Sequence, residues 1–81
     1  MEDQIKRVMA DVLVLDAETI DESTTQDSTA SWDSLRQINL VIALEQEFSV
    51  SFEVNEIESM LSFTDIVETL ERKISQAVHD Q

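Results

Sequence analysis

Hydrophobic residues recur at helical spacing in three stretches of the chain, and each stretch predicts an amphipathic helix. The first covers about residues 3–14, the second runs from Asp33 or Ser34 to Phe48, and the last follows Ser62 and ends near residue 78. Apolar residues three and four positions apart share one face of a helix, so each stripe can face a common core. The predicted core positions are Ile5, Val8, Met9, Val12, Leu13, Leu40, Val41, Leu44, Phe48, Phe63, Ile66, Val67, Leu70, Ile74 and Val78.

The segments between these helices differ in character. Residues 53–60 predict a short helix with Ile57 and Met60 turned inward, whereas residues 16–32 are rich in Ser, Thr, Asp and Glu and form a long connection. Ile20 is the apolar residue expected to attach this connection to the core. Gly and Pro are absent, which removes the usual punctuation of strands and turns. We therefore expect an all-α fold, a small bundle of three long helices and one short helix, in a single domain over residues 1–81.

The second predicted helix has more apolar surface than one core requires. Beside its core stripe runs a second apolar row of Leu35, Ile38 and Ile42. Together the two rows span roughly 220° of the helical wheel, whereas a packed face needs a little over about 100°. This second row either packs into the core or binds a partner protein, and both interpretations remain open.

Composition and charge exclude several classes of function. The net charge is −13, and residues 8–70 hold fourteen acids but a single base, Arg36, so we expect no nucleic-acid partner. The acidity either keeps a small domain soluble or attracts enzymes with basic surfaces. With no cysteine and with His79 as the only histidine, we expect no disulfide, metal site or catalytic triad. The sequence shows neither a signal peptide nor a membrane span, so we expect a cytoplasmic monomer without a membrane partner.

Ser34 has two explanations. A serine beside an aspartate before an apolar helix is typical of N-terminal capping, because the first backbone N–H groups of a helix lack partners. The wider window changes this interpretation. Asp33-Ser34-Leu35 followed by the apolar run that ends at Phe48, with Phe52, Glu56, Ile57 and Met60 beyond it, resembles the attachment site and following helices of acyl carrier proteins.

The resemblance implies a carrier and not an enzyme. In that family the serine bears a 4'-phosphopantetheine arm, transferred from coenzyme A, whose thiol holds acyl or aminoacyl cargo as a thioester. It implies that Ser34 is the attachment point and that Asp33 helps to engage the phosphopantetheinyl transferase. It also implies that Leu35, Arg36, Ile38 and Ile42 face partner enzymes. The expected partners are that transferase, acyl-activating enzymes or acyltransferases, and condensing enzymes.

The chain departs from the pattern of fatty-acid carriers at several positions. Ser31 stands where many members have glycine, Arg36 where an acid is frequent, and Asn39 where glutamate is frequent. The run Trp32-Asp33-Ser34-Leu35 is similar to stand-alone carriers of specialised pathways, such as polyketide, peptide or surface-saccharide tailoring. Trp32 either contacts a partner or packs on the loop. The alternative function is an unmodified acidic helical adaptor that binds a partner protein.

Overall fold

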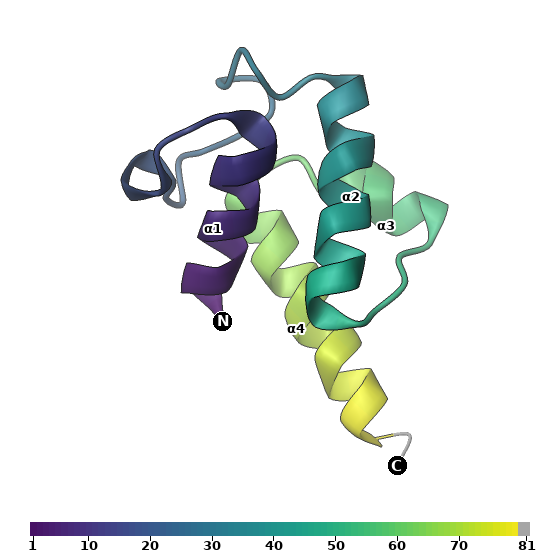
Figure 1. The fold of residues 1–81 in the computed structure, drawn as a ribbon. Helices are drawn as coiled ribbons and strands as arrows, with labels where there is room; N and C mark the ends of the chain where they lie inside the picture. The colour runs from purple at the N-terminus through teal and green to yellow at the C-terminus, as the bar shows by residue number, and fades with distance from the viewer. Residues whose placement is uncertain (80–81) are drawn as a thin grey trace.

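The computed structural model describes residues 1–79 and is built from helices (Figure 1). These are α1 (Glu2–Leu13), α2 (Ser34–Phe48), α3 (Val54–Ser59) and α4 (Phe63–His79), with a short 3-10 turn, η1 (Ala17–Thr19). The predicted all-α fold with three long helices and one short helix is confirmed. Side chains are described as far as Gln76, so the inward position predicted for Val78 and the place of the His79 side chain lie outside the described residues.

The core is formed by the predicted stripes and by residues of the connections. Val8, Val12 and Phe48, which the spacing placed in the core, and Ile57, which was expected to turn inward, are only partly buried and pack against the core. Ile74, also predicted in the core, is partly buried and lies outside the core cluster. Ile20 is 1% exposed, which confirms that it attaches the long connection to the helices. The buried apolar residues are Ile5, Met9, Leu13, Ile20, Trp32, Leu40, Val41, Leu44, Phe52, Met60, Phe63, Ile66, Val67 and Leu70.

Two helices end in left-handed backbone without glycine. Val14 has φ 56° and ψ 54° after α1, and Ser49 has φ 54° and ψ 48° after α2. The Val14 N–H donates to the Ala10 carbonyl and the Ser49 N–H to the Glu45 carbonyl, so each bond gives a partner to one carbonyl of the last turn. Glycine usually occupies such positions because a Cβ atom is disfavoured there. A chain without glycine has to place other residues in this conformation. Of Val14 and Ser49, the β-branched valine is the less suitable.

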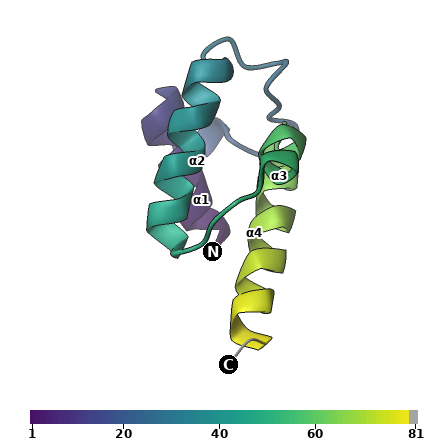
Figure 2. The same ribbon diagram turned by 90° about the vertical axis from the view of Figure 1, so that its right-hand side faces the viewer.

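The long connection between α1 and α2 is tied to the turn between α3 and α4. The Gln26 N–H donates to the Leu61 carbonyl at 2.8 Å, and the Phe63 N–H donates to the Thr24 carbonyl at 3.0 Å. The connection therefore lies across one end of the bundle, where it leads into the first turn of α2 (Figure 2). This attachment holds the backbone that precedes Ser34.

Glu56 joins α3 to α4. Its Oε1 accepts the Glu53 N–H and the Lys73 ammonium group, both at 2.8 Å. These hydrogen bonds, first that from Glu53 and then that from Lys73, lower the pKa of Glu56 below its ordinary value. A capping box thus begins α3. The Glu56 carboxylate of this box also bonds to Lys73 of α4. At its C-terminal end α4 extends past the other helices (Figure 1).

Candidate functional site

Ser34 is the first residue of α2, and Asp33 is the residue that caps the helix. Asp33 has extended backbone, and its Oδ1 accepts the Arg36 N–H at 2.8 Å while its carbonyl accepts the Gln37 N–H at 2.9 Å. The interpretation of Ser34 as an ordinary N-cap is therefore wrong. Its hydroxyl is exposed and makes no hydrogen bond within residues 1–79, which leaves it available for chemistry.

The start of α2 fits a phosphodiester on Ser34. The first two N–H groups of the helix, those of Ser34 and Leu35, donate no hydrogen bond within the described residues. Free N–H groups and the positive end of the helix dipole favour an anion at this position. The first turn of α2 contains no acidic residue, and the carboxylate of the preceding Asp33 already accepts a backbone hydrogen bond.

A buried polar pair supports this end of α2 from behind. Trp32 Nε1 donates to Gln37 Oε1 at 2.7 Å, and Gln37 Nε2 donates to the carbonyls of Ile57 and Met60, each at 3.1 Å. Of the two roles left open for Trp32, the structure favours packing over partner contact, and the side chain packs in the core, where it is 2% exposed. The indole only donates and carbonyls only accept, which fixes the orientation of the Gln37 amide. Leaving one of these buried groups unpaired costs about 1–3 kcal/mol.

The second apolar row of α2 lies on the surface. Leu35, Ile38 and Ile42 are 67%, 56% and 49% exposed, whereas Leu40 and Leu44 of the same helix are fully buried. Core packing is therefore the wrong explanation for this row. A contiguous exposed apolar row beside an exposed serine is the arrangement expected of a contact surface.

Arg36 contacts the protein itself. Its Nη1 donates to the Val12 carbonyl at 2.9 Å, so the guanidinium group lies at the negative end of α1. The side chain is partly buried, and the bond joins the C-terminus of α1 to the first turn of α2. The partner contact predicted for Arg36 stays a prediction, and this positioning role is one that the sequence pattern did not reveal.

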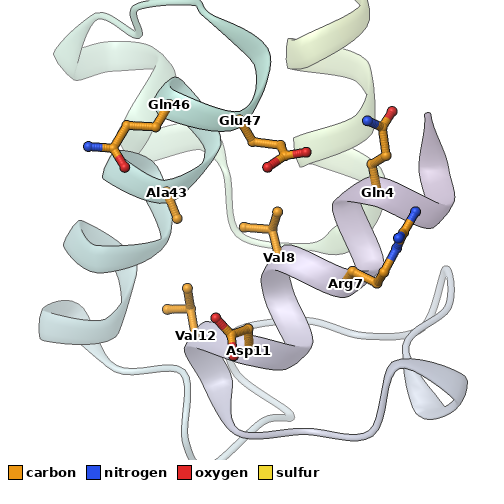
Figure 3. A pocket seen from close by; sticks show the side chains of 8 residues that line it. All are labelled: Gln4, Arg7, Val8, Asp11, Val12, Ala43, Gln46 and Glu47. Carbon is orange, nitrogen blue, oxygen red and sulfur yellow. The ribbon is translucent and has the colours of Figure 1, made fainter.

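A groove lies between α1 and α2 (Figure 3). It is lined by Gln4, Arg7, Val8, Asp11, Val12, Ala43, Gln46 and Glu47. Nine residues of helix separate Ser34 from Ala43, which corresponds to roughly 14 Å along the axis. The α2 residues that line the groove thus belong to the later turns of the helix and not to the first turn, which carries Ser34.

The described part of the chain holds neither a metal-binding cluster nor a membrane-spanning helix. No group of three or more His, Cys, Asp or Glu side chains among these residues is placed to hold a metal ion. None of the helices described is long and apolar enough to cross a membrane.

Comparison with known proteins agrees with this geometry. Residues 3–70 match the family model described as "Phosphopantetheine attachment site". The acyl carrier protein of Petrotoga mobilis is 33% identical over 75 residues, which cover 90% of this chain and 86% of that protein. The acyl carrier protein of Sinorhizobium fredii is 31% identical over 70 residues, which cover 86% of this chain and 90% of that protein.

The fold has a solved counterpart. The solution structure of the holo acyl carrier protein from Geobacter metallireducens superposes with a TM-score of 0.86 at 20% identity, covering 99% of this chain and 92% of that one. Fold and matched residues thus define a phosphopantetheine-binding carrier domain. The chain belongs to the acyl carrier protein family.

Membership fixes the general chemistry. Acyl carrier proteins carry a covalently attached 4'-phosphopantetheine and are carriers and not enzymes. They interact with a phosphopantetheinyl transferase and with biosynthetic enzymes.

Proposed function

We propose that Ser34 is the residue that bears the phosphopantetheine arm. The observation that carries this proposal is the exposed Ser34, whose hydroxyl makes no hydrogen bond among the described residues, at the first position of a helix whose N-cap is supplied by Asp33. A serine that capped its own helix would have its oxygen occupied by a backbone N–H. Here the cap and the attachment point are different residues, so modification of Ser34 leaves the helix start intact.

The residues of the chain hold the arm and do not make or break bonds of the cargo. When bound, the arm supplies the thiol that the cysteine-free sequence lacks. The N–H groups of Ser34 and Leu35, which donate no hydrogen bond among the described residues, would stabilise the negative charge of the phosphodiester. The connection that is bonded to Leu61 and Phe63 holds the backbone that leads to the exposed serine. The exposed Asp33 carboxylate is the group through which the Mg²⁺-dependent transferase recognises the site.

The partner surface is the exposed row Leu35, Ile38 and Ile42, together with the partly buried Arg36. Its position on the same helix as Ser34 supports this assignment, because an enzyme that acts on the arm has to approach that end of α2. The acidic surroundings favour partners with basic surfaces. These partners are the transferase, an acyl-activating enzyme or acyltransferase, and a condensing enzyme.

The pathway we propose is a specialised one, in polyketide, peptide or surface-saccharide tailoring. Arg36 and Asn39 support this choice, because both replace acids that are frequent in fatty-acid carriers. We propose further that residues 1–81 form one carrier domain that acts as a cytoplasmic monomer. An unmodified adaptor would explain the exposed row on α2. It gives no reason for an exposed serine beside that row whose hydroxyl makes no hydrogen bond among the described residues.

The test is modification of the purified protein. Incubation with coenzyme A, Mg²⁺ and a broad-specificity transferase should add one phosphopantetheine group to the wild-type chain and none to Ser34→Ala. The Ala variant should keep its helical content, because the Asp33 cap, which contributes about 1 kcal/mol, is untouched. Ser49→Ala, at the other end of α2, is the matched control and should be modified like the wild type. Modification of Ser34→Ala would refute the assignment, and an unmodified wild-type protein would favour the adaptor.

A further inference from the structure

Two polar side chains fill the space between α2 and the C-terminal end of α3. Trp32 and Gln37 are 2% and 8% exposed, and the Trp32 indole N–H donates to the Gln37 amide oxygen at 2.7 Å. The Gln37 amide nitrogen uses both of its hydrogens on the carbonyls of Ile57 and Met60. All three side-chain N–H donors of the pair are thus engaged inside the protein.

This polar pair lies directly beside Ser34. Gln37 is three residues further along α2, and residues at this spacing are neighbours on a helix surface. Leu40, three residues further along α2, and Met60, whose carbonyl accepts a hydrogen bond from Gln37, are both fully buried in the core. A group tethered to Ser34 that turned back toward the core between α2 and α3 would meet the Gln37 amide first.

An apolar chain could pass only by displacing that amide. Displacement would leave the indole N–H and two carbonyls buried without partners, and buried polar groups in that state are strongly unfavourable. A long saturated acyl chain gains free energy with every methylene removed from water, whereas a short or polar acyl group gains little. The hydrogen-bonded pair of Trp32 and Gln37 therefore has its largest effect on long apolar cargo.

We propose that Trp32 and Gln37 determine the cargo class by closing the route from Ser34 to the core. The carrier then holds its cargo in solvent, which suits short or polar acyl groups and disfavours long saturated chains. This inference rests on the proposed function only in taking Ser34 as the attachment point.

The test tethers chains of different length without using a transferase. Because the sequence has no cysteine, Ser34→Cys provides a unique thiol in the full chain. That thiol is joined by a disulfide to linkers of pantetheine length that end in a butyryl, octanoyl or dodecanoyl group. Failure of the transferase to modify Ser34 would count against the proposed function alone, and this series would still decide the question of the closed route.

The chain contains its own spectroscopic probes. It has one tryptophan, whose indole N–H forms part of the closure, and the methyl groups of the fully buried Met9 and Met60 report on the core. We expect the NMR signals of these three groups, and the melting temperature, to be the same for all three chain lengths. Signals or melting temperatures that move progressively from butyryl to dodecanoyl would overturn the proposal.

A pair of substitutions tests the role of the amide. Gln37→Leu removes the polar closure, so the octanoyl and dodecanoyl chains, but not the butyryl chain, should shift the Met60 methyl signal and raise the melting temperature. Asn39→Leu adds the same side chain at an exposed position of α2 and should behave like the parent. A folded Gln37→Leu protein without any dependence on chain length would contradict the assignment to Gln37. If this variant fails to fold, the length series in the parent protein decides.

Discussion

Truncation of Ile42 to alanine separates a partner-binding role from a packing role. Ile42 is 49% exposed on α2, whereas Leu40 of the same helix is fully buried. The substitution removes three carbons, each worth about 0.8 kcal/mol when fully buried, so half-burial predicts a loss of about 1 kcal/mol. Leu40→Ala should cost about 2–5 kcal/mol, because it also leaves a cavity.

The assay measures stability and recognition on the same proteins. Urea unfolding followed by circular dichroism gives the free energy of unfolding, and the rate of phosphopantetheine transfer at low carrier concentration gives kcat/KM. If Ile42 contributes about 1 kcal/mol to docking, Ile42→Ala should lower kcat/KM roughly five-fold. Leu61→Ala, which has the same 49% exposure but lies outside α2, is the matched control and should leave kcat/KM unchanged.

Two results would refute this reasoning. A loss of unfolding free energy for Ile42→Ala as large as that for Leu40→Ala would place Ile42 in the core. An unchanged kcat/KM for Ile42→Ala, with a normal fold, would remove it from the surface that the transferase contacts.

Two further predictions follow from the backbone and from the ion pair. Val14→Gly should raise the free energy of unfolding by about 1 kcal/mol in urea titrations, because it relieves the strain of a valine in left-handed backbone. The control Val54→Gly, at an exposed helical position, should lower the free energy of unfolding. A lower free energy of unfolding in both variants would contradict the argument. Glu56→Gln should destabilise the fold near neutral pH, because a carboxyl whose folded-state pKa is lowered adds stability that is lost as pH falls through that pKa. The Glu56→Gln variant should therefore lose less stability than the wild type between about pH 6 and pH 3. Glu58→Gln, at an exposed position, is the control. Equal losses of stability in Glu56→Gln and in the wild type would count against the role of Glu56.

The helices were predictable from the sequence because apolar spacing is a local property. The stripes of α1, α2 and α4 place the core residues on one face whatever the rest of the chain does. The exposed row of Leu35, Ile38 and Ile42 was visible for the same reason, as apolar surface beyond the width of one packed face. What the pattern left open was whether a partner or the core covers it.

The polar contacts of the site depend on segments that are distant in sequence. Gln37 bonds to carbonyls twenty and twenty-three residues away, and Arg36 bonds to Val12 twenty-four residues earlier. One signal for Gln37 was present, since it continues the stripe of Leu40, Val41 and Leu44 by one turn. A polar side chain at a core position predicts a buried hydrogen-bond network, but its partners follow only from the packed structure.

The choice between Asp33 and Ser34 as the cap also required the structure. Both residue types cap helices well, and the two stand side by side in the sequence. Their roles are separated by the backbone path of the preceding connection, which Trp32 fixes through its bond to Gln37. With that path set, Asp33 has the extended backbone of a cap and Ser34 begins the helix.

Mass spectrometry of the protein purified from its native host tests the central claim most directly. Fragmentation should place one phosphopantetheine group on the peptide that contains Ser34, and the intact mass should reveal a short or polar acyl group held on it as a thioester. A chain that is unmodified, or that is modified at a residue other than Ser34, would contradict the account.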